Sequence, residues 1–316
     1  MIYPWQQQQW QAFTLQQTQQ RLAHAILLSG HQGLGKLSLA AQMAKSVLCT
    51  ESDSEACGNC HSCQLFVAGT HPDHSLITPE DEGKQIKIEQ IRQLKNKQQL
   101  TPTVSKWKTV IIEPADMMNI SSNNSLLKLL EEPQANTLLV LITSKPERLP
   151  ITLKSRCQKV VLNAPNYQDA CQWIQQQGSF DAAQLEPLLS IAKGAPLQAL
   201  NLSETDVLQH LAQIDSDFEL MLRRQANPVT MAKDWQQYNL MLVLNHLQYD
   251  VKKRLLATPA ELNVKLNKRY WAIYDCIIRA IKLTSSANNI NKILLVEQFI
   301  VSVMDKHWNK TSTINF

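Results

Sequence analysis

One segment near the N-terminus restricts the possible folds of this chain more than any other. The apolar run Ala25–Ser29 leads directly into Gly30–Lys36 (GHQGLGK), and apolar residues then recur at helical spacing at Leu39, Met43 and Val47. A strand, a glycine-rich turn and a helix in this order form a P-loop, whose backbone N–H groups and lysine can surround a phosphate. The segment therefore predicts an α/β domain with a mostly parallel sheet.

Strand and helix patterns continue to alternate along the first half of the chain. Short apolar runs predict strands at 109–112, 138–143 and 159–162, and helical spacing predicts helices at 88–94 and 126–131. Pro133 ends the second of these helices. After Asn166 the strand patterns disappear, and helical periodicity continues to the C-terminus. The sequence thus predicts an α/β region followed by an all-helical region.

Composition and charge argue against a membrane protein and against a dedicated nucleic-acid-binding protein. The formal net charge of +4 arises from residues 206–316, and so small an excess does not indicate a nucleic-acid groove. The N-terminus lacks the basic and apolar regions of a signal peptide, and no apolar run approaches the roughly 20 residues that span a bilayer. We therefore expect a cytoplasmic protein without membrane contact.

Four of the seven cysteines form a dense cluster, Cys49, Cys57, Cys60 and Cys63. The cytosol keeps thiols reduced, so such a cluster indicates a metal site rather than disulfides. Four thiolates suit tetrahedral Zn²⁺ and leave no open position, which predicts a structural site. A histidine could replace Cys49 as the fourth ligand, and the candidates are His61, His71 and His74. A redox Cys-x-x-Cys is the competing interpretation, but that motif needs no third or fourth cysteine.

The ATP site to which the P-loop would belong departs from that of a working ATPase in two places. Leu37 stands where a Ser or Thr would bind Mg²⁺, and Ser38 would point roughly 100° away around the helix. The strand that follows ends in Glu113-Pro114 instead of Asp-Glu, so Pro114 offers no carboxylate to polarise a water. We therefore expect no ATP hydrolysis. The pattern leaves open whether a nucleotide still binds at Gly30, Gly33, Gly35 and Lys36.

Several motifs follow one another in the order seen in the bacterial clamp-loader AAA+ family, which the chain resembles over residues 3–163. They are the P-loop, the cysteine cluster, Ala115–Asn119, Leu126–Pro133 and Ser155–Cys157. The resemblance implies an α/β AAA+ P-loop domain with a parallel sheet and a zinc module at 1–163. It also implies a small helical lid domain at 164–205 and an all-α collar domain at 206–316 that joins homologous subunits.

The resemblance also implies roles for single residues. In the family's motor members, the arginine of the Ser-Arg-Cys turn reaches ATP on a neighbouring subunit, and Arg156 matches it. Thr143 matches the sensor-1 position, whereas Leu197 stands where motor members carry the sensor-2 arginine. The family pattern therefore implies a non-hydrolysing subunit whose Arg156 acts in trans.

The partners implied by the family are ATP-hydrolysing motor subunits and a clamp-opening subunit, arranged in a hetero-oligomeric ring. This ring loads the sliding clamp of DNA polymerase III onto primed DNA, which this chain would contact weakly or indirectly. One alternative is an active ATPase motor of the same family. Another is a zinc-dependent nucleic-acid-binding module, but the acidic stretch 51–55 beside the cysteines would repel phosphates.

Overall fold

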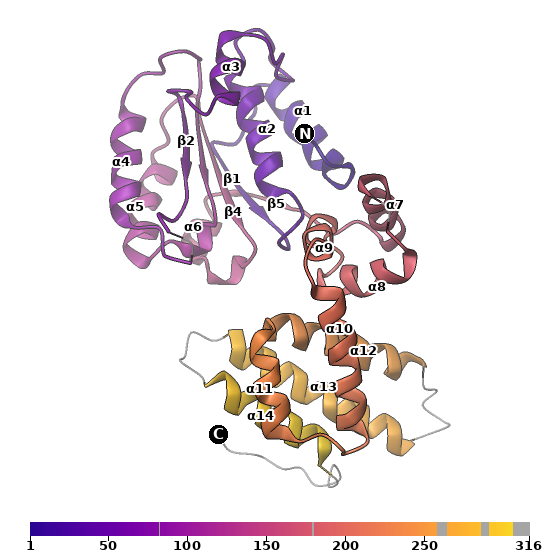
Figure 1. The fold of residues 1–316 in the computed structure, drawn as a ribbon. Coiled ribbons are helices and arrows are strands. Elements are labelled where there is room, and N and C mark those ends of the chain that lie inside the picture. The colour runs from indigo at the N-terminus through magenta and orange to yellow at the C-terminus, as the bar shows by residue number, and fades with distance from the viewer. Residues whose placement is uncertain (82, 179, 258–263, 286–290, 306–316) are drawn as a thin grey trace. The chain divides into compact units, whose positions relative to one another are not determined.

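The computed structural model describes residues 1–316 except 82, 179, 258–263, 286–290 and 306–316 (Figure 1). The chain forms two compact units, Met1–Asn166 and Tyr167–Phe316. The first unit is α/β, and the described part of the second is helical. Within the described residues, no helix combines the length and the apolar character needed to cross a membrane.

The first unit is built on a five-stranded parallel sheet with the order β2-β3-β4-β1-β5. The strands are β1 (Ala25–Ser29), β2 (His74–Ile77), β3 (Lys108–Ile112), β4 (Thr137–Thr143) and β5 (Gln158–Val161). Every residue of β1, β3 and β4 is buried, as expected for a parallel sheet covered on both faces. The sequence patterns do not indicate β2, because this edge strand is short and two of its four residues are polar.

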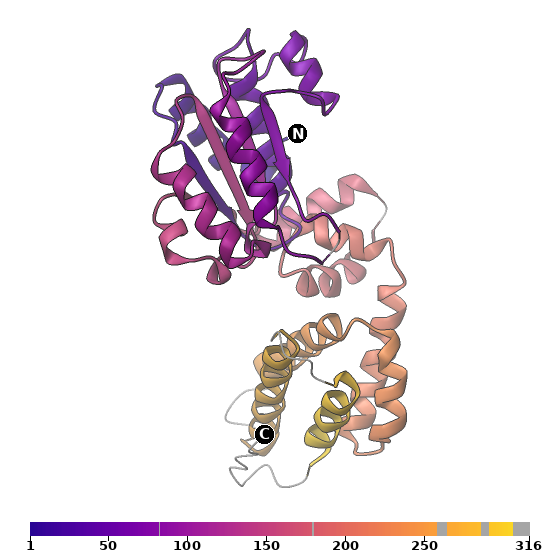
Figure 2. The ribbon, with the colours of Figure 1, turned by 90° about the vertical axis from the view of Figure 1, so that its left-hand side faces the viewer.

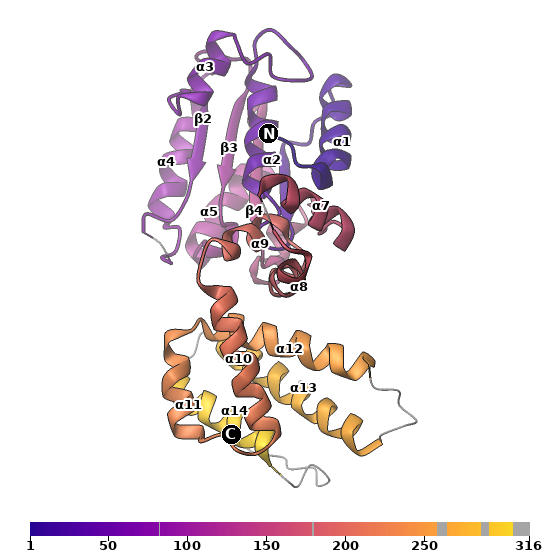
Figure 3. The same cartoon turned by 45° about the vertical axis from the view of Figure 1, so that its right-hand side comes forward.

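Helices cover both faces of this sheet (Figures 1 and 2). Apolar residues of α4 and α5 pack with alternate residues of β1, β3 and β4 on one face, and α2 packs on the other. Helix α1 lies beside α2 (Figure 3). The helical elements are η1 (Pro4–Gln6), α1 (Gln7–Thr18), α2 (Lys36–Leu48), α3 (His61–Val67), α4 (Ile88–Gln99), η2 (Ala115–Met117), α5 (Ile120–Glu131), η3 (Pro146–Arg148) and α6 (Ile151–Lys154).

The second unit has one hydrophobic core that runs through its helices. Ile174 and Leu188 from the first helices belong to the same buried cluster as Phe218, Leu247 and Ile300. The elements are α7 (Tyr167–Gln177), α8 (Ala182–Ile191), α9 (Pro196–Ser203), α10 (Val207–Leu222), α11 (Pro228–Asp234), η4 (Trp235–Gln237), α12 (Leu240–Ala257), α13 (Val264–Ser285) and α14 (Lys292–Met304). The expected subdivision near residue 205 into lid and collar stays a prediction.

Candidate functional sites

The P-loop lies at the carboxyl end of β1, between the neighbouring strands β4 and β5. Glycine is required at two of its positions by close approach of other groups. A Cβ on Gly30 would lie 2.4 Å from the carbonyl oxygen of Leu162, and one on Gly35 would lie 2.5 Å from the ring of Tyr3. Gly35 also has a φ of 72°, which L side chains rarely adopt.

The P-loop lysine, Lys36, donates hydrogen bonds to acceptors within its own unit. Its Nζ donates to the carbonyl oxygens of Gly30 (2.9 Å) and His31 (2.7 Å) and to Ser144 Oγ (2.9 Å). An ammonium has three N–H donors, so these bonds occupy all of them. Burial lowers the pKa of Lys36, against the opposing effect of Glu113 and Asp116 nearby. In this conformation Lys36 has no donor left for a phosphate.

The N-terminal segment packs against the same loop. Gln6 Nε2 donates to the carbonyl oxygens of Leu34 (2.7 Å) and Gly35 (2.8 Å), and Trp5 Nε1 donates to Leu34 (3.0 Å). The loop's backbone is therefore held from outside by residues about 30 positions earlier in the sequence. Sequence patterns do not indicate this contact, because no local periodicity connects the two segments.

The two positions after the lysine offer no free hydroxyl to a metal. Leu37 is 40% exposed at the start of α2. Ser38 Oγ donates to the carbonyl oxygen of Met1 (2.7 Å), so its hydroxyl is bound to the N-terminal segment. The expectation that Ser38 cannot replace the missing Mg²⁺ ligand stays a prediction.

Residues after β3 and at the end of β4 form a polar cluster near Lys36. Burial raises the pKa of Glu113, and the nearby Lys36 opposes this effect. Thr143, which is fully buried, donates from Oγ1 to Asp116 Oδ1 (2.6 Å) and accepts from the backbone N–H of Lys145 (2.9 Å). The carboxylate of Asp116 is thus bound by Thr143 within the unit.

The structure brings the four clustered cysteines together at one end of α2. Their sulfur atoms all lie within 4.8 Å of one another. Cys49 caps the C-terminus of α2, and Cys60 caps the N-terminus of α3 with its sulfur accepting from the N–H of Cys63 (3.4 Å). Backbone N–H groups of Cys57 and Cys60 also point at cysteine sulfurs, at 3.4 and 3.3 Å. Such N–H···S contacts stabilise thiolates.

The acidity of the clustered thiols differs strongly. Burial opposes ionisation of Cys60, but hydrogen bonds from Thr50 and Cys63 outweigh it and lower the pKa of Cys60 to about 6. Burial raises the pKa of Cys63 to about 12. Without a cation, four sulfurs this close cannot all carry a negative charge, because like charges raise one another's pKa. A bound divalent cation would remove this conflict.

Two of the three candidate histidines, His71 and His74, are hydrogen-bonded to other groups. His71 bonds Ser62 Oγ through Nε2 (2.9 Å) and accepts from the N–H of Asp73 through Nδ1 (3.1 Å). His74 Nδ1 bonds Thr109 Oγ1 (2.8 Å), and burial lowers the pKa of His74 to about 4. The four-sulfur cluster includes no histidine, among the residues that the structure describes.

The three residues of the Ser-Arg-Cys turn have different environments. Cys157 is buried in the core, and burial raises its pKa to about 11. Ser155 Oγ donates to the carbonyl oxygen of Thr152 (3.0 Å). The side chain of Arg156 is 36% exposed, and its terminal nitrogens contact Glu131 Oε1 (2.8 Å) and the carbonyl oxygen of Thr152 (2.8 Å).

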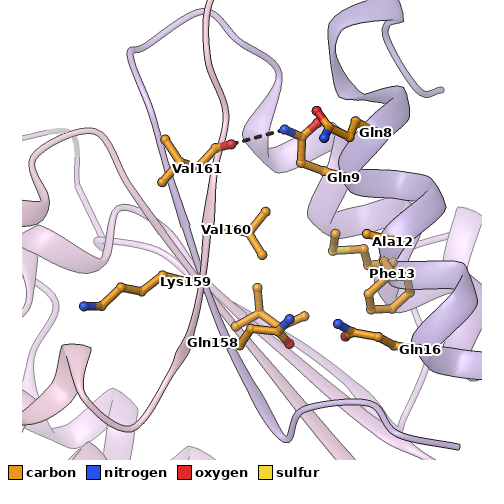
Figure 4. A pocket seen from close by; sticks show the side chains of 11 residues that line it. Gln8, Gln9, Ala12, Phe13, Gln16, Gln158, Lys159, Val160 and Val161 are labelled. Atoms are coloured by element: carbon orange, nitrogen blue, oxygen red, sulfur yellow. Dashed lines mark hydrogen bonds between the residues drawn. The ribbon is translucent and has the colours of Figure 1, made fainter.

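A pocket of 240 Å³ lies between α1 and the edge strand β5 (Figure 4). On one side of the pocket, Gln9 Nε2 donates a hydrogen bond to the carbonyl oxygen of Val161 (3.2 Å). The lining is mostly glutamine and apolar, and its one charged residue, Lys159, points away from α1 (Figure 4). Without converging ionisable groups, this pocket is not a candidate for catalysis.

Comparison with known proteins places the chain in a family. The family model described as "DNA polymerase III, delta subunit" matches residues 5–166. The DNA polymerase III subunit delta' of Pseudomonas aeruginosa is 32% identical over 319 residues, which cover 95% of this chain and 96% of that protein. The chain belongs to the DNA polymerase III delta' family. Its Bacillus subtilis member is 33% identical over 285 residues, covering 87% of this chain and 84% of that protein.

Members of a second subunit type are also similar to this delta' family chain. The DNA polymerase III subunit tau of Bacillus subtilis is 32% identical over 195 residues, covering 58% of this chain and 33% of that protein. The resemblance to the clamp-loader AAA+ family and the α/β AAA+ fold class with C-terminal helices, both expected from the motifs, are confirmed.

The predicted site residues of this delta' family chain fall into three separate places. Gly30, Gly33, Gly35 and Lys36 form the P-loop, and the four cysteines form their cluster at the other end of α2. Arg156 lies apart from both, beside the C-terminus of α5. Leu197 belongs to α9 of the second unit and is partly exposed. Sequence patterns do not indicate the partners Ser144, Asp116 and Glu131, since each contact joins elements distant in the chain.

Proposed function

We propose that this chain is a non-hydrolysing subunit of the DNA polymerase III clamp loader. Its similarity to the Pseudomonas aeruginosa delta' subunit along almost the whole length of both chains carries the proposal. The subunit would join a hetero-oligomeric ring in the cytoplasm, and the similarity to a tau subunit of one of the same organisms supports homologous neighbours in that ring. Motor subunits, a clamp-opening subunit, the sliding clamp and primed DNA are the proposed partners.

The chemistry of the P-loop supports the non-hydrolysing part of the proposal. Phosphoryl transfer needs a lysine on the phosphates, a hydroxyl on Mg²⁺ and a residue that orients the attacking water. Lys36 is bound to three protein acceptors, Leu37 has no hydroxyl and Pro114 has no carboxylate. The hydroxyl and the water-orienting carboxylate are missing, and Lys36 is held within the loop, so we expect the P-loop not to support hydrolysis.

Arg156 is proposed to act on ATP held by the adjacent motor subunit. A guanidinium is planar, stays charged and can bind phosphoryl oxygens through two N–H groups. The exposed position of Arg156 on a turn anchored by buried Cys157 suits contact with another subunit. Arginines that act in this way increase the rate of hydrolysis at the neighbouring site by about 10³–10⁵-fold.

Zn²⁺ is the metal that fits the cysteine cluster. The four thiols match the preference of zinc for sulfur, and sulfur atoms within 4.8 Å of one another fit around one tetrahedral ion. Cys49, Cys57, Cys60 and Cys63 would hold it. The ion would join the end of α2 to the start of α3 and would have a structural role.

The test of the proposed function is the clamp loader reconstituted with Arg156→Ala. The variant removes an outward side chain, so we expect normal assembly but slower clamp- and DNA-stimulated ATP hydrolysis and impaired clamp loading. Arg156→Lys should recover little, since a point charge does not reproduce the planar fork. Lys159→Ala, which removes a nearby positive charge, is the matched control. Hydrolysis and loading at the unmodified rate in Arg156→Ala would contradict the trans role.

A further inference from the structure

The guanidinium of Arg156 is held in one orientation by two acceptors of its own unit. One terminal nitrogen lies 2.8 Å from Glu131 Oε1, and the other donates to the carbonyl oxygen of Thr152 at 2.8 Å. These contacts use one hydrogen on each terminal nitrogen. The other N–H donors of the guanidinium stay available for an acceptor outside the unit.

Both ends of the Glu131–Arg156 pair are attached to the same core. Glu131 is the last residue of α5 and directly follows the buried Leu129 and Leu130. Arg156 directly precedes the buried Cys157, and all three buried residues belong to one cluster. The partial negative charge at the C-terminus of α5 favours a guanidinium at this place. The backbones that carry the pair are therefore fixed relative to each other.

We propose that Glu131 is a positioning residue that orients the Arg156 guanidinium for ATP on the neighbouring subunit. This inference rests on the proposed trans role of Arg156. An arginine side chain has many rotamers. Only the molecules whose guanidinium is already oriented toward the phosphate stabilise the transition state. The side chains of Arg156 and Glu131 are 36% and 49% exposed, so the ion pair is weak. Its loss should therefore change the rate of ATP hydrolysis by at most several-fold.

The carboxylate has two opposing effects on this role. It orients the guanidinium by accepting a hydrogen bond, but its negative charge repels an approaching phosphate. Glu131→Gln keeps an oxygen acceptor at the same place and removes the charge, whereas Glu131→Ala removes both. Orientation by hydrogen bonding therefore predicts that the glutamine variant retains activity and the alanine variant loses it.

The experiment uses the complete reconstituted clamp loader and measures clamp- and DNA-stimulated ATP hydrolysis. We expect Glu131→Ala to lower the rate about three- to five-fold. Glu131→Gln should stay within about two-fold of the unmodified complex. Glu132→Ala is the matched control, because it removes the adjacent exposed carboxylate. In the Arg156→Ala background, Glu131→Ala should cause no further loss, since its effect acts through Arg156.

The outcomes separate this inference from the proposed function. An unmodified rate in Arg156→Ala means that the trans role itself is wrong. A loss in Arg156→Ala together with equal rates in Glu131→Ala and Glu132→Ala leaves the trans role intact and overturns the positioning role. A rise in rate in Glu131→Ala means that the pair restrains the arginine, which also overturns it. If Glu131→Ala does not assemble, a loss of activity in assembled Glu131→Gln equal to that of Arg156→Ala overturns orientation by hydrogen bonding.

Discussion

At the scale of single residues, the P-loop is held in shape by contacts within its own unit. Gly30 and Gly35 are required by close contacts with Leu162 and Tyr3, which lie in the same unit. Lys36 keeps its position because three acceptors bind it. Packing and internal hydrogen bonds therefore account for Gly30, Gly35 and Lys36 in this loop.

The first prediction is that the isolated chain hydrolyses ATP no faster than background. Leu37→Thr alone should not restore turnover, because Pro114 still lacks a carboxylate and Lys36 is still bound within the loop. Phosphate release with and without Mg²⁺ is the measurement, and Lys36→Ala is the control. Turnover that disappears in Lys36→Ala would show that the loop is a working ATP site.

At the scale of elements, the cysteine cluster connects α2 to α3. The second prediction is one zinc ion per chain, measured by elemental analysis of the purified protein. The double variant Cys60→Ser, Cys63→Ser removes two sulfurs from a four-sulfur site and should lose the metal. Cys276→Ser, in the helical unit, is the control and should keep it. A folded, metal-free chain would contradict the zinc assignment.

Asp73 joins the loop after α4 to the start of β2. Its carboxylate accepts hydrogen bonds from the backbone N–H groups of Thr103 (2.7 Å), Val104 (2.8 Å) and Ser105 (2.9 Å). Burial favours the neutral acid, but these hydrogen bonds outweigh it and lower the pKa of Asp73 below its usual 3.8. The stability it contributes is therefore present above about pH 3.8 and is lost as the pH falls through the lower folded-state pKa.

The third prediction concerns this carboxylate. Asp73→Asn turns an NH₂ group toward backbone donors and should lower the free energy of unfolding at pH 7 by about 1–3 kcal/mol. The variant should also lose less stability than the unmodified protein between pH 5 and 3, roughly the range over which carboxylates become protonated. Urea unfolding across this range is the measurement, and exposed Asp53→Asn is the control. If the free energy of unfolding changed with pH in the same way for Asp73→Asn and the unmodified protein, this role would be contradicted.

At the scale of the whole molecule, the chain consists of two units with separate cores. In the helical unit, Trp235 is 2% exposed and donates from Nε1 to Oδ2 of buried Asp217 (2.8 Å). The fourth prediction is that Trp235→Phe lowers the stability of this unit by about 2–3 kcal/mol, because a buried carboxylate loses a donor. Hydrogen exchange should show faster opening within 167–305 and little change within 1–166. Equal acceleration in both units would mean that the chain unfolds as one.

The sequence by itself determined the local features of this protein. Strand, turn and helix at the P-loop, the buried strands and the spacing of the four cysteines all depend on neighbours in the chain, so periodicity and residue type reveal them. The missing hydroxyl at Leu37 is also a local fact. The family was identifiable for the same reason, because its motifs are short and follow in a set order.

Only the tertiary structure decided which distant residues meet. Edge strand β2 exists because it pairs with β3, and its own four residues carry little signal. Lys36 meets Ser144 because β1 and β4 are neighbours in the sheet, and Arg156 meets Glu131 because α5 and α6 pack together. Such contacts depend on strand order and on helix packing over long sequence separations, which local patterns do not record.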